Sequence, residues 1–293
     1  MRRLIVTADD FGLAEAVNQA VEAGHRDGIL TGASLMVGAP AAADAVARAR
    51  RLPSLRVGLH VVLVDGRPLL PPERIPDLVT AAGRFRNDMA LAGINFLRPS
   101  VRRQLAAEIR AQFAAFGATG LPLDHANAHK HFHLHPTVAG LIAAIGREFG
   151  LAAVRLPHEP GAVLRRADPQ APGRLAARLL GPWTALLRWQ LRRAGLATND
   201  HVFGITWTGA MTEARLLALL PHLPPGVSEL YCHPAVERPP EFQPSMPEYR
   251  PVEEYRALVS PKVKAALAEA GIALTCFGAL PPVPRAVPRP GRR

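Results

Sequence analysis

Three short segments, far apart in this chain, each join an apolar run to side chains that bind metals or move protons. Asp9 and Asp10 follow the apolar residues 4–8, and His60 follows residues 57–59. A third segment, residues 124–136, contains five histidines. Carboxylates and imidazoles are common ligands of divalent metals, and imidazole also exchanges protons near neutral pH. The three segments therefore predict one divalent metal ion with an acid or base beside it.

The two adjacent aspartates come directly before Phe11 and Gly12. Neighbouring residues of a strand point to opposite faces, but glycine permits a sharp turn at the end of a strand. Both carboxylates can then reach one pocket and have different roles there. We expect Asp10 or Asp9 to bind the metal and the other to accept a proton. A helix-capping role for one of them is the alternative.

The histidines of the third segment all fall on odd positions. They are His125, His129, His131, His133 and His135. One unbroken strand would place all of them on one face, and a single tetrahedral ion that also binds an aspartate cannot use five. We therefore expect the strand to end within the run and His129, after Ala128, to be the ligand. His131 and His133 would contact the ligands or bind substrate. A surface cluster with adventitious metal affinity is the alternative.

Two later strand ends supply further candidates. His233 ends the run 229–232, and its ordinary pKa near neutrality suits a group that protonates a leaving group. Arg155 ends the run 152–154 and could orient a carboxylate or the substrate. A purely structural ion pair explains Arg155 equally well.

Short apolar runs alternate with amphipathic helical stretches along most of the chain. Strands are expected at residues 4–8, 29–37, 56–63, 122–128, 152–156, 202–207, 229–232 and 272–276. Helices are expected at residues 14–28, 41–51, 100–116, 137–149, 174–193, 212–220 and 252–270. This α/β alternation predicts a barrel of about seven to eight parallel strands, with a doubly wound open sheet as the alternative. A barrel gathers the carboxyl ends of its strands at one rim.

The alternation of predicted strands and helices indicates a single domain over residues 1–278 with two insertions. The insertion near residues 64–99 is long and rich in proline, and the one near residues 157–200 contains the predicted helix 174–193. That helix interleaves tryptophan and leucine with arginine, which suits either a membrane surface or packing against the barrel. Residues 279–293 are rich in proline and arginine, and we expect them to be disordered.

Composition narrows the cellular setting. The formal net charge is +11, from 35 basic and 24 acidic residues, which favours anionic partners. No nucleic-acid motif accompanies this charge, so we expect no nucleic-acid partner. Two cysteines, Cys232 and Cys276, do not form a disulfide framework, and no apolar run is long enough to span a bilayer. We expect a cytoplasmic protein; peripheral contact with the inner face of the membrane and a homo-oligomer both stay open.

Four motifs occur in a specific order. They are Thr7–Gly12, Val57–His60, His129–His133 and Cys232–Pro234. Over about residues 1–277 the chain resembles the YdjC-like carbohydrate deacetylases, distant relatives of the NodB-type polysaccharide deacetylases on a distorted β/α barrel. The resemblance implies Asp10, His60 and His129 as ligands of one magnesium or zinc ion. It also implies Asp9 as the catalytic base and His233 as the general acid.

Residues 124–136 further resemble the hopanoid-biosynthesis-associated, HpnK-type branch. That resemblance implies a deacetylase of an N-acetylglucosaminyl hopanoid lipid. Soluble N-acetylated oligosaccharides such as chitooligosaccharides are the alternative substrates, and a non-catalytic glycolipid-binding protein is a further alternative. A glycoside hydrolase is disfavoured because adjacent aspartates do not flank a glycosidic bond. Asn127 and Ala128 stand where most relatives have Asp-Ser, and Asp124 is a candidate to replace that aspartate.

Overall fold

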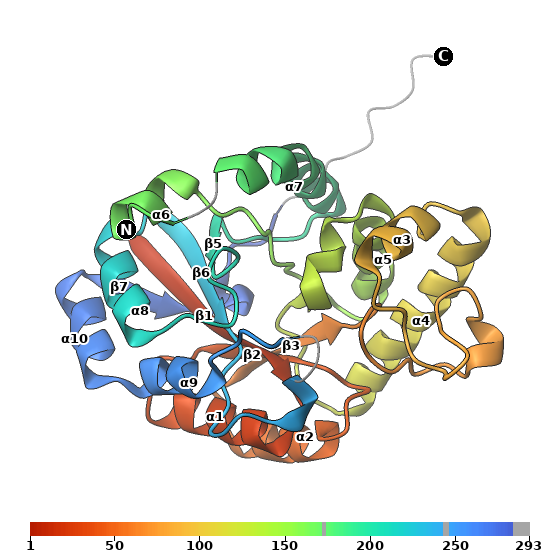
Figure 1. The fold of residues 1–293 in the computed structure, drawn as a ribbon, viewed down its shortest axis with the longest axis horizontal. Coiled ribbons are helices and arrows are strands. Elements are labelled where there is room, and N and C mark those ends of the chain that lie inside the picture. Colours follow the sequence, from red (N-terminus) through yellow and green to blue (C-terminus); the bar gives the residue numbers. More distant parts are fainter. Residues whose placement is uncertain (172–173, 243–245, 284–293) are drawn as a thin grey trace.

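The computed structural model describes residues 1–171, 174–242 and 246–283. Within these residues a seven-stranded parallel sheet forms the centre of the molecule, and helices lie around its outside (Figure 1). The strands are β1 (Arg2–Phe11), β2 (Gly32–Leu35), β3 (Arg56–Val61), β4 (Ala126–Ala128), β5 (His201–Phe203), β6 (Gly226–Cys232) and β7 (Ile272–Thr275). Their order is β4-β3-β2-β1-β6-β5, and β7 pairs with the first residues of β1. This confirms the predicted distorted parallel barrel.

An extended segment near the β4 edge of the sheet is only partly paired. Isolated parallel bridges join Val154 to Ala126 of β4 and Ala153 to Ala197. The predicted strand at residues 152–156 is therefore present as bridges and not as a full strand. Leu156 donates its N–H to the side chain of Asn199 at 2.7 Å, and a proline follows it, so the ladder cannot continue.

The helices agree with most of the predicted positions. They are α1 (Glu15–Arg26), α2 (Ala42–Arg51), α3 (Met89–Asn95), α4 (Pro99–Ala118), α5 (Pro136–Glu148), α6 (Gly161–Ala167), α7 (Arg174–Ala194), α8 (Glu213–Leu219), α9 (Pro251–Val259) and α10 (Pro261–Glu269). Short 3₁₀ helices are η1 (Pro72–Arg74), η2 (His129–Leu134), η3 (Leu220–His222), η4 (Pro240–Phe242) and η5 (Phe277–Ala279). No helix of the described chain is long and apolar enough to cross a membrane.

The single helix predicted over residues 252–270 is wrong, because the structure divides it into α9 and α10. Pro261 lacks an N–H and occupies the first turn of α10. The hydroxyl of Ser260 accepts the N–H groups of Lys262 and Val263 at 3.2 and 3.3 Å. Ser260 is therefore the N-cap of a new helix, and it ends the preceding one.

Both predicted insertions contain ordered elements. Residues 64–99 include η1, an antiparallel bridge between Val79 and Phe85, and α3. They lie on the side of the molecule that carries α4 (Figure 1), and the backbone N–H groups of Leu69 and Leu70 donate to Glu108 of that helix. Residues 157–200 include α6 and α7, and α7 packs against α5. Of the tail predicted to be disordered, residues 284–293 lie outside the described residues.

Candidate metal centre

The carboxyl ends of β1, β3 and β4 meet at one rim of the sheet. Asp10 lies at the end of β1, His60 at the end of β3, and His129 directly after β4. Asp10 has a φ of 60°, in the left-handed region that few residues other than glycine adopt. This local reversal ends the alternation of the strand, so that Asp9 and Asp10 can both serve the same rim.

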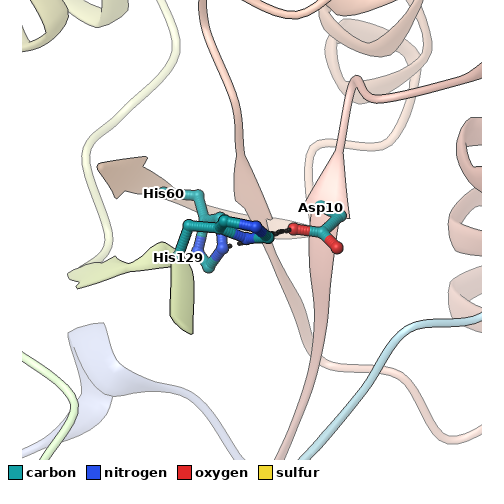
Figure 2. Close-up of side chains that lie close together, drawn as sticks. All are labelled: Asp10, His60 and His129. Carbon is teal, nitrogen blue, oxygen red and sulfur yellow. Dashed lines mark hydrogen bonds and ion pairs between the residues drawn. The ribbon is translucent and has the colours of Figure 1, made fainter. Parts of the chain in front are cut away.

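Asp10 contacts both candidate histidine ligands. Its Oδ1 lies 3.3 Å from Nε2 of His60 and 3.1 Å from Nδ1 of His129. In Figure 2 one carboxylate oxygen faces the two imidazoles and the other is turned away. One candidate ligand atom from each residue lies within 4.8 Å of the others. The three side chains predicted to bind the metal are thus brought together.

The same three residues pass a chemical test for a divalent cation. All are buried, and Oδ2 of Asp10 has no hydrogen-bond partner among the described residues. Leaving a carboxylate oxygen buried and unpaired costs free energy, so a ligand such as a metal ion is expected there. Burial raises the pKa of Asp10, but the imidazoles of His129 and His60 outweigh it and hold that pKa well below its ordinary value. One carboxylate and two imidazoles suit zinc, and carboxylate-containing sites also take magnesium.

Asn127 fixes the orientation of His60. Its amide nitrogen donates to Asp9 Oδ1 at 3.1 Å and to the hydroxyl of Ser34 at 2.9 Å. Because a carboxylate only accepts, the amide oxygen of Asn127 must face His60 Nδ1, which lies 2.6 Å away. His60 therefore donates from Nδ1 to Asn127, which leaves Nε2 as the ring nitrogen that would bind an ion beside Asp10.

Asp9 faces a buried arginine. Nη1 and Nη2 of Arg155 donate to its two oxygens at 2.5 and 2.9 Å, and the same guanidinium donates to Glu229 at 2.7 to 3.0 Å. Arg155 and Glu229 are fully buried. Burial raises the pKa of Asp9, but Arg155 outweighs it and lowers that pKa far below its ordinary value. Arg155 therefore pairs with two carboxylates, which fits both a group that orients Asp9 and a structural ion pair.

His233 lies beyond the end of β6 and faces the same rim. It is 6% exposed, and its Nδ1 has no hydrogen-bond partner among the described residues. Its backbone N–H donates to Glu254 Oε2 at 2.6 Å. Its ring lies 4.8 Å from that of Tyr249 and 5.6 Å from that of Tyr231, measured between centroids. A buried imidazole with a free nitrogen is available to exchange a proton with a ligand.

Comparison with known proteins decides the family. The family model described as YdjC-like protein matches residues 3–269. The chain belongs to the YdjC-like family. A carbohydrate deacetylase of Geobacillus stearothermophilus is 31% identical over 278 residues, which cover 94% of this chain and 97% of that protein. One of Brevibacillus brevis is 37% identical over 155 residues, which are 53% of this chain and 59% of that protein.

A solved structure shares the fold of this YdjC-like chain. It is that of a putative cellobiose-phosphate cleavage protein from Enterococcus faecalis V583, with 26% sequence identity and a TM-score of 0.74. The match covers 94% of this chain and 97% of that one. The similarity therefore extends over nearly the whole chain.

In this YdjC-like protein, the remaining histidines of the run do not form one face of a strand. β4 ends at Ala128, and Lys130 and His131 have φ values of 51° and 55°. His131 Nε2 lies 2.9 Å from the hydroxyl of Tyr231, and burial lowers the pKa of His131 to about 3. His133 accepts the N–H of Ala128 on Nδ1, and its Nε2 has no partner among the described residues. Both are neutral side chains near the site.

Asp124 is directed toward His125 and Gly278 and not toward the candidate metal ligands. It contacts Nδ1 of His125 at 3.0 Å and accepts the N–H of Gly278 at 2.9 Å. The ring of His125 stacks on Phe277, so both residues hold β4 against η5. Asn127 itself lies between His60 and Asp9 and contacts both.

Three contacts were missed by sequence reasoning: Glu229 with Arg155, Tyr231 with His131, and Glu254 with His233. Glu229 interrupts an apolar strand, and a charged residue inside a buried strand is the signal that could have drawn attention to it. Glu254 lies in a helix among other charged residues and gives no such signal.

A cavity of about 340 Å³ lies against His129. Its size is at the lower end of the range for small-molecule sites, about 300–1,000 Å³. The lining includes Met36, Val62, Leu69, Arg84, Gln112 and Met246. The wall is mostly apolar with a few polar groups.

Proposed function

We propose that the protein is a metal-dependent carbohydrate deacetylase, and that its substrate is an N-acetylglucosaminyl hopanoid lipid. One observation carries the proposal: a buried Asp-His-His group that fits a divalent cation has a carboxylate, Asp9, beside it. The family and the relatives named carbohydrate deacetylase support the reaction class. The resemblance of residues 124–136 to the hopanoid-associated branch motivates the lipid.

Asp10, His60 and His129 would hold the ion. When bound, a divalent ion at this place lowers the pKa of an attacking water and stabilises negative charge on the acyl oxygen. Asp9 accepts the proton of that water. Arg155 keeps the carboxylate of Asp9 ionised and fixed in position. Asp9 can therefore accept a proton at any pH near neutrality, although it is a weak base.

His233 supplies the second proton transfer. An amide nitrogen leaves poorly unless it is protonated as the C–N bond breaks. The unpartnered Nδ1 of His233 is the group that would donate this proton to the sugar amine. The products are then acetate and a free amino sugar, and the histidine is restored by the proton released from water.

The test is a comparison of two substrates with tag-free protein supplied with zinc or magnesium. N-acetylglucosaminyl hopanoid lipid in detergent and soluble chitooligosaccharide are each incubated with the protein, and free amine is measured. Amine from the lipid alone supports the proposal. Amine from the soluble sugar alone contradicts the lipid assignment, and tight lipid binding with no amine contradicts the enzymatic role. Asp9→Asn is the matched control for amine released by a contaminant.

A further inference from the structure

The insertion before α4 carries a concentrated apolar surface. Met89, Leu91, Ile94 and Leu97 have exposed fractions of 45%, 46%, 66% and 63%. We call these four side chains the α3 tip. Exposed apolar side chains are ordinary when scattered, but a cluster on one short element marks an interaction surface.

The α3 tip is held from below by ordered contacts. Phe96 is buried, and its ring lies 5.4 Å from that of Phe132 and 5.8 Å from that of His135. The side chain of Asp88 accepts the N–H of Leu91 at 2.9 Å and caps the helix. The element therefore already has a buried apolar side, and the tip is a second apolar side that faces solvent.

Arginines flank the tip in the sequence. Residues 84–103 contain five arginines and one acidic residue, Asp88. The arginines Arg84, Arg98, Arg102 and Arg103 are exposed. Apolar side chains framed by arginines fit the interface of a bilayer that contains anionic lipid, where the former enter the acyl boundary and the latter meet phosphates. A second copy of the chain fits less well, because a two-fold contact would bring the same arginines together.

The tip and the candidate site belong to the same part of the chain. Asp65, Gly66, Leu69 and Arg84 of this insertion line the cavity that lies against His129. Phe132, which supports the tip, belongs to η2, and η2 begins with His129. The insertion that carries the tip thus also forms part of the cavity wall, and η2 contacts both.

We propose that the α3 tip docks the protein on an anionic membrane surface, with the metal centre facing that surface. The docking itself does not depend on the reaction. The further consequence, that substrate reaches the cavity from the bilayer, rests on the proposed function. It assigns the substrate to the class of membrane-resident glycolipids.

Vesicle co-sedimentation of the full chain tests the docking. Vesicles of phosphatidylcholine with phosphatidylglycerol are compared with vesicles of phosphatidylcholine alone. The variant Leu91→Ser/Ile94→Ser/Leu97→Ser should lose about tenfold or more in partitioning to the anionic vesicles, since it removes most of the inserted apolar area. Leu274→Ser is the matched control, because Leu274 is 44% exposed on β7 and should have no effect. Thermal unfolding of each variant verifies that it is folded.

Several results would overturn the docking proposal. The proposal fails if the wild-type protein does not bind anionic vesicles. It also fails if the folded tip variant binds them as strongly as the wild type does. Loss of binding in Trp183→Ser/Trp189→Ser alone would assign the membrane contact to α7, where these side chains are 48% and 54% exposed. A dimer that the tip substitutions dissociate, with no vesicle binding, would assign the tip to a second copy. Vesicle binding by a protein that releases no amine would keep the docking and refute only the proposed function.

Discussion

Arg155 holds both carboxylate oxygens of Asp9 in a bidentate ion pair, at 2.5 and 2.9 Å. The other edge of the same guanidinium is occupied by Glu229. Two buried carboxylates therefore share one buried cation, which leaves this cluster with one net negative charge before any metal binds. The arrangement fixes Asp9 in position and keeps it ionised, which is what a proton acceptor beside a metal ion requires.

Asp9→Asn tests the role of Asp9 as the base. The amide cannot accept the proton, so turnover should fall by about 10²- to 10⁴-fold. Metal content should not change, because Asp10, His60 and His129 are intact. Amine release and bound metal are measured on the same preparation. Near-normal turnover would refute the assignment of the base.

Arg155→Met tests the buried ion pair. The substitution leaves Asp9 and Glu229 unpaired in the interior, and breaking a buried pair costs about 3–5 kcal/mol. The free energy of unfolding from urea titration measures this loss. Arg110→Met is the control, because Arg110 and Glu148 form an exposed pair whose removal should hardly move the urea midpoint. Equal midpoints for the Arg155 variant and wild type would mean that the cluster does not stabilise the fold.

Asn127 offers a way to separate metal binding from catalysis. Asn127→Ala removes the acceptor of the His60 Nδ1–H, and metal affinity should weaken by about 10- to 100-fold. Asn127→Asp keeps that acceptor and should retain affinity for zinc. Turnover should still fall, because the new carboxylate lies against Asp9 and disturbs it. Zinc competition with a chromophoric chelator measures the affinity. An alanine variant with wild-type affinity would show that Asn127 does not position His60.

Much of the candidate site follows from the sequence because its elements are local. An apolar run that ends in an acid or a histidine marks the end of a buried strand, and parallel strands place such ends at one rim. The pair Asp9 and Asp10, together with His60 and His129, could be named as candidates in this way without a structure. Only the resemblance to the YdjC-like family selected Asp10 as the metal ligand of the pair. The break at Ser260 could also be predicted, since Pro261 cannot continue a helix.

The contacts that tune the site could not be predicted from local pattern. Arg155 and Glu229 are 74 positions apart, and their pairing depends on the curl of the sheet between them. The amide of Asn127 acquires its role from where Asp9 and His60 lie in space. The exposed face of α3 was missed for a similar reason, because which side of a short helix is buried depends on what packs beneath it.

Glu254 should give the protein a measurable pH dependence of stability. Its carboxyl is buried, and burial raises its pKa from 4.5 to about 7, despite hydrogen bonds from the N–H groups of Met211 and His233. The folded chain therefore binds this proton more tightly than the unfolded chain. Protonated Glu254 therefore adds to the free energy of unfolding. This stabilisation is complete below about pH 4 and is lost as pH rises through 7, a change of about 3 kcal/mol.

Glu254→Gln isolates that contribution. The free energy of unfolding is measured by urea titration from pH 4 to pH 8 for wild type and variant, and the wild-type value minus the variant value should fall across this range. The difference is needed because His131, whose pKa is lowered to about 3, makes stability rise with pH over much of the same range. Parallel curves for the two proteins would contradict the raised pKa of Glu254.

The most direct test of the central claim is an anomalous difference map from crystals of tag-free protein soaked in zinc. A single strong peak should lie about 2.0–2.2 Å from a carboxylate oxygen of Asp10, from Nε2 of His60 and from a ring nitrogen of His129. Crystals of His129→Ala should lose that peak. A map with no peak among these three side chains, or with zinc bound only elsewhere on the protein, would contradict the account.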